Sequence, residues 1–352
     1  MRQGIINHYR AYLPVSDTTP VVTLFEGDTP LIPAPRLAEV ITPGLKLFLK
    51  FEGMNPTGSF KDRGMTLAVT KALEDGARAI MCASTGNTSA AASAYAARAG
   101  LDCVVLLPNT DVALGKLSQA LIHGAKVLAI EGTFDDALRL TREICAKYPI
   151  TIVNHVNPHR IEGQKTGAFE ICDDLGDAPD FHALPVGNAG NITAYWKGYL
   201  EYQTAGNSRI LPKMLGFQAA GAAPIVDGAP VLNPHTIATA IRIGNPASWQ
   251  HALAARDQSG GVIDKVTDDE ILEAYQMLPA LEGVFTEPAC AAPIAGLKKL
   301  YNAGYFRDYD GATVAVTLTG HGLKDPERAI KTVPHPATIP ADLESVVRAL
   351  GF

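Results

Sequence analysis

Short apolar runs alternate with helical segments through much of this chain, and this alternation limits the possible fold more than any other feature. Between residues 79 and 153 the apolar runs have the length of strands, and turn residues stand at nearly every junction. Strands that alternate with helices form parallel sheets with crossover helices. We therefore expect strands at 79–83, 103–107, 126–130 and 150–153, and helices at 89–99, 114–123 and 134–147.

The rest of the chain continues this pattern with longer spacing. Further strands are expected at 21–25, 46–52, 182–186, 214–219, 262–266 and 313–318. Further helices are expected at 8–14, 161–172, 192–202 and 289–302, and Thr267 with Glu270 forms a capping box that starts another one. Residues 220–246 show only weak periodicity and are rich in proline and glycine.

A turn at residues 55–58 delivers Lys61 to the start of a helix. Ser59 and Asp62 have the spacing of a capping box, so Lys61 is expected in the first helical turn. Cations are disfavoured at that end of the helix dipole, and a lysine held there loses its proton more readily. A neutral amine is what a Schiff-base lysine needs. The alternative is an ordinary solvated lysine in a charged first turn.

Four polar loops follow predicted strands or precede helices, at 55–64, 84–88, 187–191 and 319–322. Open α/β sheets bind ligands at the carboxyl ends of their strands, so these loops are candidates for one site. The 187–191 loop, Gly-Asn-Ala-Gly-Asn, can direct backbone amides at an anion and is a candidate phosphate cradle. It lacks the glycine patterns of dinucleotide and Walker loops, and an ordinary tight turn is the alternative.

Composition and charge exclude several classes of protein. The 352 residues suffice for two domains, and a net charge of -6 without a basic block gives no case for a nucleic-acid partner. No apolar run approaches the length of a membrane span, and no signal-peptide core follows Met1. The five cysteines are scattered without metal-ligand spacing. We expect no metal site and a reducing compartment, the cytoplasm.

The four loops belong to motifs by which the chain resembles the threonine synthase family, in its short form without an N-terminal regulatory extension. These are pyridoxal-phosphate enzymes of the tryptophan-synthase β fold, also called fold type II. The resemblance covers nearly the whole chain, and its motifs lie at 26–31, 55–63, 84–88, 154–166, 187–191 and 319–326. Phe25, Asp28, His159 and Cys290 depart from the usual family residues, and none of them is the reactive lysine.

The resemblance implies an α/β fold of two parallel-sheet, doubly wound domains with the cofactor in the cleft between them. The small domain is expected at residues 54–148, and the large one at 1–53 plus 149–352. Because the 84–88 loop must reach a cofactor held mostly on the large domain, we expect the small domain to move and close on substrate. Homodimers are common in this fold.

The implied reaction converts O-phospho-L-homoserine and water to L-threonine and phosphate with pyridoxal 5'-phosphate, by γ-elimination and β-addition of water. Lys61 would hold the cofactor and then move protons. The other implied cofactor contacts are Asn87 at the 3' oxygen, Gly187, Asn188, Ala189, Gly190 and Asn191 at the phosphate, and Thr319 at the pyridine nitrogen, with Thr317 as a competitor for that last role. A neutral threonine would leave that nitrogen less charged than a carboxylate partner would.

The substrate needs two further groups of contacts. Ser84, Thr85 and Thr88 would bind its carboxylate at the positive end of the following helix. Its phosphate requires a second anion site, for which Lys116, Asn154 and Arg160 are the candidates, and the fixed donor fork of arginine suits a phosphate. For Lys116 and Lys165 a solvated charge is the ordinary alternative.

Two other functions remain open on the sequence. A serine or threonine dehydratase of the same fold would perform β-elimination and would not need a second phosphate site. A non-catalytic protein that binds a phosphorylated metabolite would carry no covalently held cofactor. Phosphate release from O-phosphohomoserine separates these possibilities.

Overall fold

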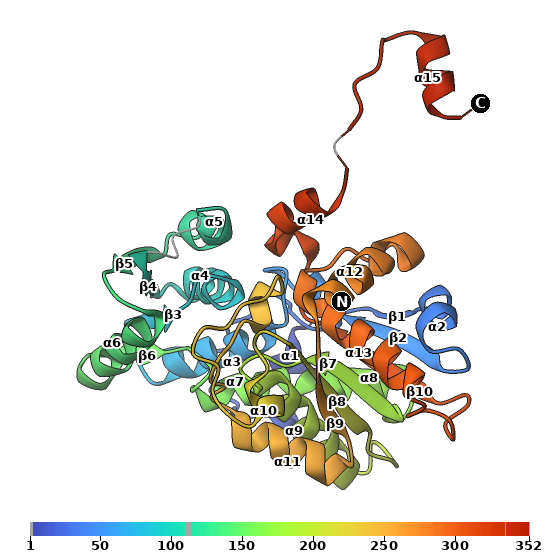
Figure 1. The fold of residues 1–352 in the computed structure, drawn as a ribbon. Coiled ribbons are helices and arrows are strands. Elements are labelled where there is room, and N and C mark those ends of the chain that lie inside the picture. Colours follow the sequence, from blue (N-terminus) through green and yellow to red (C-terminus); the bar gives the residue numbers. More distant parts are fainter. Residues whose placement is uncertain (1–2, 110–113, 335, 352) are drawn as a thin grey trace.

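Two separate parallel sheets organise the chain in the computed structural model, which describes residues 3–109, 114–334 and 336–351 (Figure 1). The smaller sheet has the strand order β5-β4-β3-β6, and all its pairs are parallel. Its strands are β3 (Ala79–Ala83), β4 (Asp102–Pro108), β5 (Lys126–Ile130) and β6 (Ile150–Ile152). Because β6 pairs with β3, this sheet extends past residue 148, where the sequence places the end of the small domain.

The larger sheet has six strands in the order β1-β2-β10-β7-β8-β9. The edge pair β1 (Leu31–Pro33) and β2 (Lys46–Phe51) is antiparallel, and every other pair is parallel. The remaining strands are β7 (Phe181–Pro185), β8 (Lys213–Ala219), β9 (Val262–Val266) and β10 (Thr313–Leu318). The two-sheet α/β architecture expected from the alternating pattern is confirmed.

Helices cover both sheets (Figure 1). They are α1 (Ile5–His8), α2 (Pro35–Ile41), α3 (Lys61–Glu74), α4 (Asn87–Ala99), α5 (Leu114–Ile122), α6 (Phe134–Lys147), α7 (Pro158–Gln164), α8 (Thr166–Leu175), α9 (Gly190–Thr204), α10 (Pro224–Asp227), α11 (Trp249–Ser259), α12 (Asp268–Glu282), α13 (Ala291–Asn302), α14 (Pro326–Thr332) and α15 (Leu343–Ala349). The capping box of Thr267 with Glu270 starts α12 as expected. Short 3-10 turns include η4 (Thr239–Ile241) and η5 (Pro288–Cys290).

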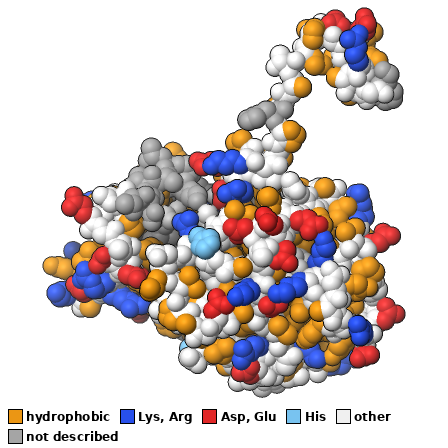
Figure 2. Space-filling model, viewed as in Figure 1, with side chains coloured by type: hydrophobic (Ala, Val, Ile, Leu, Met, Phe, Trp, Pro, Cys, Tyr) orange, Lys and Arg blue, Asp and Glu red, His pale blue; other side chains and the backbone are white. Residues whose placement is uncertain are grey.

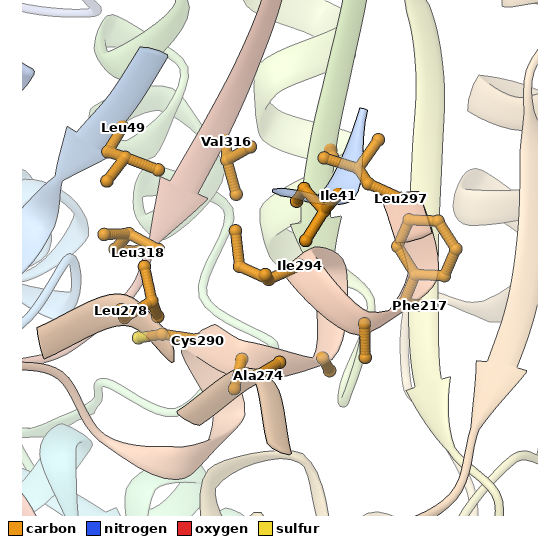
Figure 3. Close-up of a cluster of buried hydrophobic side chains, with 14 of the residues drawn as sticks. Ile41, Leu49, Phe217, Ala274, Leu278, Cys290, Ile294, Leu297, Val316 and Leu318 are labelled. Carbon is orange, nitrogen blue, oxygen red and sulfur yellow. The ribbon is translucent and has the colours of Figure 1, made fainter. Parts of the chain in front are cut away.

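The main core packs α2, α12 and α13 against the larger sheet (Figure 3). Leu49, Val316 and Leu318 project from its strands, and Ile294 and Leu297 project from α13. The smaller sheet has its own core, in which the alanines of α4 pack beside Val105 and Leu107. Each sheet therefore has its own hydrophobic support, as expected of a domain.

The expected strand at 21–25 is wrong. Backbone groups of Val22 bond to side chains of α3 instead of a neighbouring strand: its N–H donates to Thr70 Oγ1 at 3.0 Å, and its carbonyl accepts from Thr66 Oγ1 at 2.6 Å. The expected helix at 161–172 is divided into α7 and α8, which meet at Lys165. Helices α2 and α11 did not stand out in the sequence pattern.

The C-terminal residues form an arm that stands clear of the body and carries α15 (Figures 1 and 2). Leu343, Val346, Val347 and Leu350 share one face of this helix, and Leu343 is 81% exposed. Within the described part of the chain, every helix is too short or too polar to span a bilayer.

Candidate active site

A cavity of about 210 Å³ opens at the carboxyl ends of both sheets, beside Ala83 at the end of β3 and Pro185 at the end of β7. Its wall brings together all four polar loops of the sequence, through Lys61, residues 84–88, residues 187–191 and Thr319. Asn154, His155 and Arg160 also line it, as do residues of η4. This is the place where an open α/β sheet binds its ligand.

Lys61 is fixed beside Thr319 by pairing between two loops. Phe60 N–H donates to Thr319 O at 2.9 Å, and His321 N–H donates to Gly58 O at 2.9 Å. These bonds hold the first turn of α3 against the end of β10, although the two segments are more than 250 residues apart in the chain.

The expected capping box at the start of α3 is wrong. Phe60 occupies the cap position without a side-chain cap bond, and Ser59 Oγ lies 3.4 Å from Lys61 N. The carboxylate of Asp62 turns back instead and accepts from Thr57 N–H at 2.7 Å and from the Thr57 hydroxyl. Lys61 is nevertheless the first residue of the helix, as expected.

Burial holds the pKa of Lys61 at about 7, well below that of a free lysine, and the nearby Arg160 cation lowers it further while Glu287 raises it. A substantial fraction of this amine is therefore neutral near pH 7. The cause differs from the sequence argument, which relied on the helix dipole. A lysine with a lowered pKa in a cavity is a candidate nucleophile or Schiff-base residue.

Two glycines bring Arg160 into the same cavity. A Cβ on Gly163 of α7 would lie 2.0 Å from Arg63 O of α3, and a Cβ on Gly64 would lie 2.7 Å from Arg160 Nε. No larger residue fits at either position, so α3 and α7 cross closely and place Lys61 and Arg160 on one wall. The sequence motif therefore has a packing reason.

Arg160 is 2% exposed and has few partners. Its Nη1 donates to Val153 O at 2.8 Å, and its Nε finds no acceptor among the described residues. Burial lowers the pKa of the guanidinium to about 10, and it remains charged at neutral pH. A buried cation with free donors that faces a cavity is suited to an anionic group of a ligand.

The 187–191 loop has the geometry of an anion cradle. Ala189 takes a left-handed conformation with φ 64°, and α9 begins directly after it at Gly190. Both side-chain amide atoms of Asn191, which is 8% exposed, lack a hydrogen-bond partner in the described structure. Unsatisfied buried polar atoms at a helix N-terminus fit a bound phosphate. Together with the lowered pKa of Lys61, this donor set fits pyridoxal 5'-phosphate.

Helix α4 directs its N-terminus at the cavity. The helix begins at Asn87, two residues earlier than expected, so Asn87 and Thr88 lie in its first turn. Ser84, Thr85 and Thr88 all line the cavity, and Ser84 Oγ accepts from Gly86 N–H at 3.2 Å. Hydroxyls at the positive end of a helix suit a carboxylate.

Glu287 is the residue that sequence reasoning missed at this site. It accepts a hydrogen bond from Asn87 Nδ2 at 2.9 Å and another from Thr319 Oγ1 at 3.0 Å. Burial raises the pKa of its carboxyl group. No local pattern indicates this role, because 200 residues separate Glu287 from Asn87.

Thr317 and Thr319 have different surroundings. Thr319 lines the cavity, whereas Thr317 is fully buried and its hydroxyl lies 2.7 Å from His182 Nε2. The other nitrogen of that imidazole, Nδ1, lies 2.8 Å from Tyr199 OH. Thr317 therefore belongs to a buried polar chain behind the site, and Thr319 is the candidate for a ligand contact.

The remaining basic and amide candidates also differ. Both ends of the Asn154 side-chain amide bond to the backbone of Ala83, at 2.9 Å each, so Asn154 holds the 84–88 loop in place at the edge of the cavity. Lys165 is buried and paired with Glu162 and Glu201, which is a structural role. Lys116 lies in α5, but its side chain is outside the described residues. Over the described ranges, no three His, Cys, Asp or Glu side chains gather as metal ligands would.

Comparison with known proteins agrees with this geometry. The family model described as "Pyridoxal-phosphate dependent enzyme" matches residues 22–320. The threonine synthase of Synechocystis sp. is 58% identical over 352 residues, which cover 99% of this chain and 91% of that one. The threonine synthase of Mycobacterium leprae is 59% identical over 350 residues, which cover 99% and 96%.

Solved structures show the same fold at low identity. Maize serine racemase matches with a TM-score of 0.76 at 17% identity, over 94% of this chain and 97% of that one. Threonine deaminase isoform 2 of Solanum lycopersicum matches with a TM-score of 0.74 at 21% identity, over 93% and 92%. These similarities confirm the fold class expected from the sequence. The chain belongs to the pyridoxal-phosphate-dependent enzymes and, within them, to the threonine synthase family.

Proposed function

We propose that this protein converts O-phospho-L-homoserine and water to L-threonine and phosphate, with pyridoxal 5'-phosphate as its cofactor. The observation that carries the proposal is the presence of two separate anion-binding groups in one cavity. Asn191 and the N-terminus of α9 offer one set of donors, and the buried Arg160 offers another. A phosphorylated substrate bound beside a phosphorylated cofactor requires two such places.

The residues divide the work by their chemistry. When bound, pyridoxal 5'-phosphate supplies an electron-withdrawing ring that stabilises negative charge on the substrate carbon next to the amine. The 187–191 loop and Lys61 hold that group, Asn87 lies at its 3' oxygen, and Thr319 lies at its ring nitrogen. Lys61 Nζ, whose pKa is about 7, then takes the proton from the substrate Cα.

The substrate is oriented by its two anionic ends. Ser84, Thr85 and Thr88 bind its carboxylate at the start of α4, and Arg160 binds its phosphate. Phosphate leaves from the γ carbon while Arg160 compensates its growing charge, which is where a buried guanidinium is most effective. Asn154 keeps the 84–88 loop at the correct distance through its two bonds to Ala83. Lys116 remains a second candidate for the phosphate.

The test is phosphate release from O-phospho-L-homoserine by the purified, cofactor-loaded protein, with threonine measured in the same reaction. The proposal requires phosphate and threonine in equal amounts. A protein that deaminates serine or threonine but releases no phosphate would be a dehydratase. A protein that binds the substrate without turnover would be a binding protein.

We infer that the enzyme is a homodimer and that the arm of residues 333–351 contacts the second copy. Leu343, Val346, Val347 and Leu350 give α15 an apolar face that the described part of the same chain leaves exposed. Light scattering on the full chain and on a chain that ends after Thr332 tests this inference, because only the full chain should be dimeric. The cysteines of the described chain are all free, which supports a reducing, cytoplasmic location.

The two-sheet architecture also supports a small domain, near residues 54–148 and extended to include β6, that closes on substrate. Crystals without substrate and with a substrate analogue should differ in the orientation of the two sheets. Identical orientations would contradict this part of the proposal.

A further inference from the structure

Glu287 connects two side chains that come from opposite sides of the cavity. Asn87 begins α4 beside the smaller sheet, and Thr319 follows β10 of the larger sheet. Glu287 itself is 4% exposed, and each of its carboxylate oxygens accepts one of the two hydrogen bonds, at 2.9 and 3.0 Å. A carboxylate buried to this extent needs such donors, because an unpaired charge in the interior is costly.

The position of Glu287 is fixed by its backbone. Glu287 N–H donates to Gly320 O at 3.0 Å, and a Cβ on Gly320 would lie 2.6 Å from the Glu287 carboxyl carbon. Only glycine permits the carboxylate to lie this close to the chain that follows Thr319. The cations of Lys61 and Lys324 both favour its ionised form. The arrangement is therefore built around the carboxylate.

Counting protons determines how these side chains face a ligand. A threonine hydroxyl has one proton and can also accept. The Asn87 Nδ2 group can only donate, and it has two protons, of which Glu287 uses one. If the single proton of Thr319 is donated to Glu287, the hydroxyl has only lone pairs left to present to the cavity.

We propose that Glu287 is a positioning residue that takes the only hydroxyl proton of Thr319, so that Thr319 accepts a hydrogen bond from the cofactor ring nitrogen instead of donating one. Two facing lone pairs repel, so the ring nitrogen keeps its proton in this enzyme. The same carboxylate orients Asn87 with its second N–H free for the ring oxygen. This inference rests on the proposed function, and it reverses the expectation that a neutral threonine leaves the nitrogen less charged.

The consequence is chemical. A protonated ring withdraws electrons more strongly than a neutral one, and hydrogen bonds to the ring nitrogen are a main way in which a protein tunes this cofactor. Elimination from the γ carbon requires loss of protons from two neighbouring substrate carbons, which makes a strong electron sink useful.

The test is the ¹⁵N NMR signal of the ring nitrogen in the wild-type protein loaded with ¹⁵N-labelled cofactor, without substrate. We expect the signal in the range of a protonated pyridine nitrogen. A signal in the unprotonated range overturns the proposal, and this measurement needs no variant.

The Glu287→Gln variant then sharpens the test. Because Asn87 Nδ2 can only donate, the glutamine oxygen must face it, and the glutamine NH2 group must face Thr319 and donate to it. The hydroxyl proton is released, so the ring signal should move downfield to the unprotonated range. An unchanged signal in this variant contradicts the proposal.

A second pair of variants isolates the hydroxyl. In a Thr319→Val background the Glu287→Gln change should move the ring signal much less, because the connecting hydroxyl is absent. A shift of the full size in that background would show that Glu287 acts by its charge alone and would overturn the positioning role. Phosphate release is measured separately, so a protein with a protonated ring nitrogen but no phosphate release would contradict only the proposed function.

Discussion

Helix α3 carries two basic side chains, two residues apart, in opposite environments. Arg63 is 1% exposed and is enclosed by carboxylates: its Nε lies 2.7 Å from Glu52 Oε2, and its Nη2 lies 2.6 Å from Glu170 Oε2. Lys50 adds a second cation at 3.0 Å from Glu170. These carboxylates raise the pKa of Arg63, and the cations hold the pKa of Glu170 far below its usual range.

The cavity side of the same helix has cations without matching carboxylates. The pKa of Lys61 is lowered to about 7 and that of Arg160 to about 10, in both cases mainly by burial. Glu287 is the nearby acid, and its oxygens already accept bonds from Asn87 and Thr319. A closed ion-pair network holds a fold in one arrangement, whereas buried and underpaired cations provide a place for an anionic ligand.

The largest effect is expected from Lys61→Ala. Loss of the amine that moves protons should reduce turnover by about 10²–10⁴-fold or more, while the Arg63 network keeps the protein folded. Borohydride reduction of the wild-type holoenzyme, followed by peptide mapping, should place the pyridoxyl group on Lys61. Lys71→Ala on the same helix is the control, since Lys71 pairs with Glu74 outside the cavity. A label on Lys116 or Lys165 would contradict the assignment.

The second effect concerns stability. Arg63→Met leaves Glu52 and Glu170 buried without their main cation, which should cost about 3–5 kcal/mol in the free energy of unfolding. Arg160→Met removes a cation that has no carboxylate partner and should cost much less. Urea unfolding of both variants measures the contrast, with exposed Arg139→Met as a control that should change little. Equal losses at Arg63 and Arg160 would show that the comparison between the two clusters is wrong.

The third effect separates the two proposed reactions. Arg160→Ala removes a charge-assisted phosphate contact, which costs on the order of 1.5–3 kcal/mol, so kcat/KM for O-phosphohomoserine should fall roughly 10–150-fold. The bound cofactor should remain, because its phosphate lies at 187–191. Any weak deamination of serine should change much less, because serine carries no phosphate. Equal loss of both activities, or of neither, would make Arg160 a structural residue.

The fourth effect is a pH dependence. Only the neutral amine of Lys61 can attack the cofactor aldehyde, and its neutral fraction rises as pH increases through about 7. Recombination of the apoprotein with pyridoxal 5'-phosphate should therefore accelerate about tenfold between about pH 6 and pH 8, and then level off. Stopped-flow absorbance measures this rate. A rate that continues to rise beyond about pH 9 would indicate an ordinary lysine.

Buried parallel strands were predicted from the sequence with the correct ends. Strands β3, β5, β9 and β10 match their expected bounds, because apolar runs between turn residues are a sufficient local signal. The segment 21–25 has the same appearance, but distant threonines of α3 satisfy its backbone, and no local pattern shows this.

The candidate site follows the same division. The four loops were predicted because each ends a strand or starts a helix, and the structure brings all of them to one cavity. Two features were not predictable in this way. Glu287 meets Asn87 and Thr319 only through the tertiary fold, and the capping role of Asp62 is replaced by its bonds to Thr57.

The smallest effect distinguishes two threonines on one strand and extends the contrast between closed and open polar groups. Thr317→Val breaks one bond of the buried chain through His182 to Tyr199, which should cost about 1 kcal/mol of unfolding free energy. Because Thr317 faces His182 and not the cavity, affinity for pyridoxal 5'-phosphate should not change. Thr319→Val should instead weaken that affinity, since it removes a hydroxyl from the cavity wall. Fluorescence titration of both apoproteins with the cofactor decides between them, and weaker binding in Thr317→Val alone would exchange the two roles.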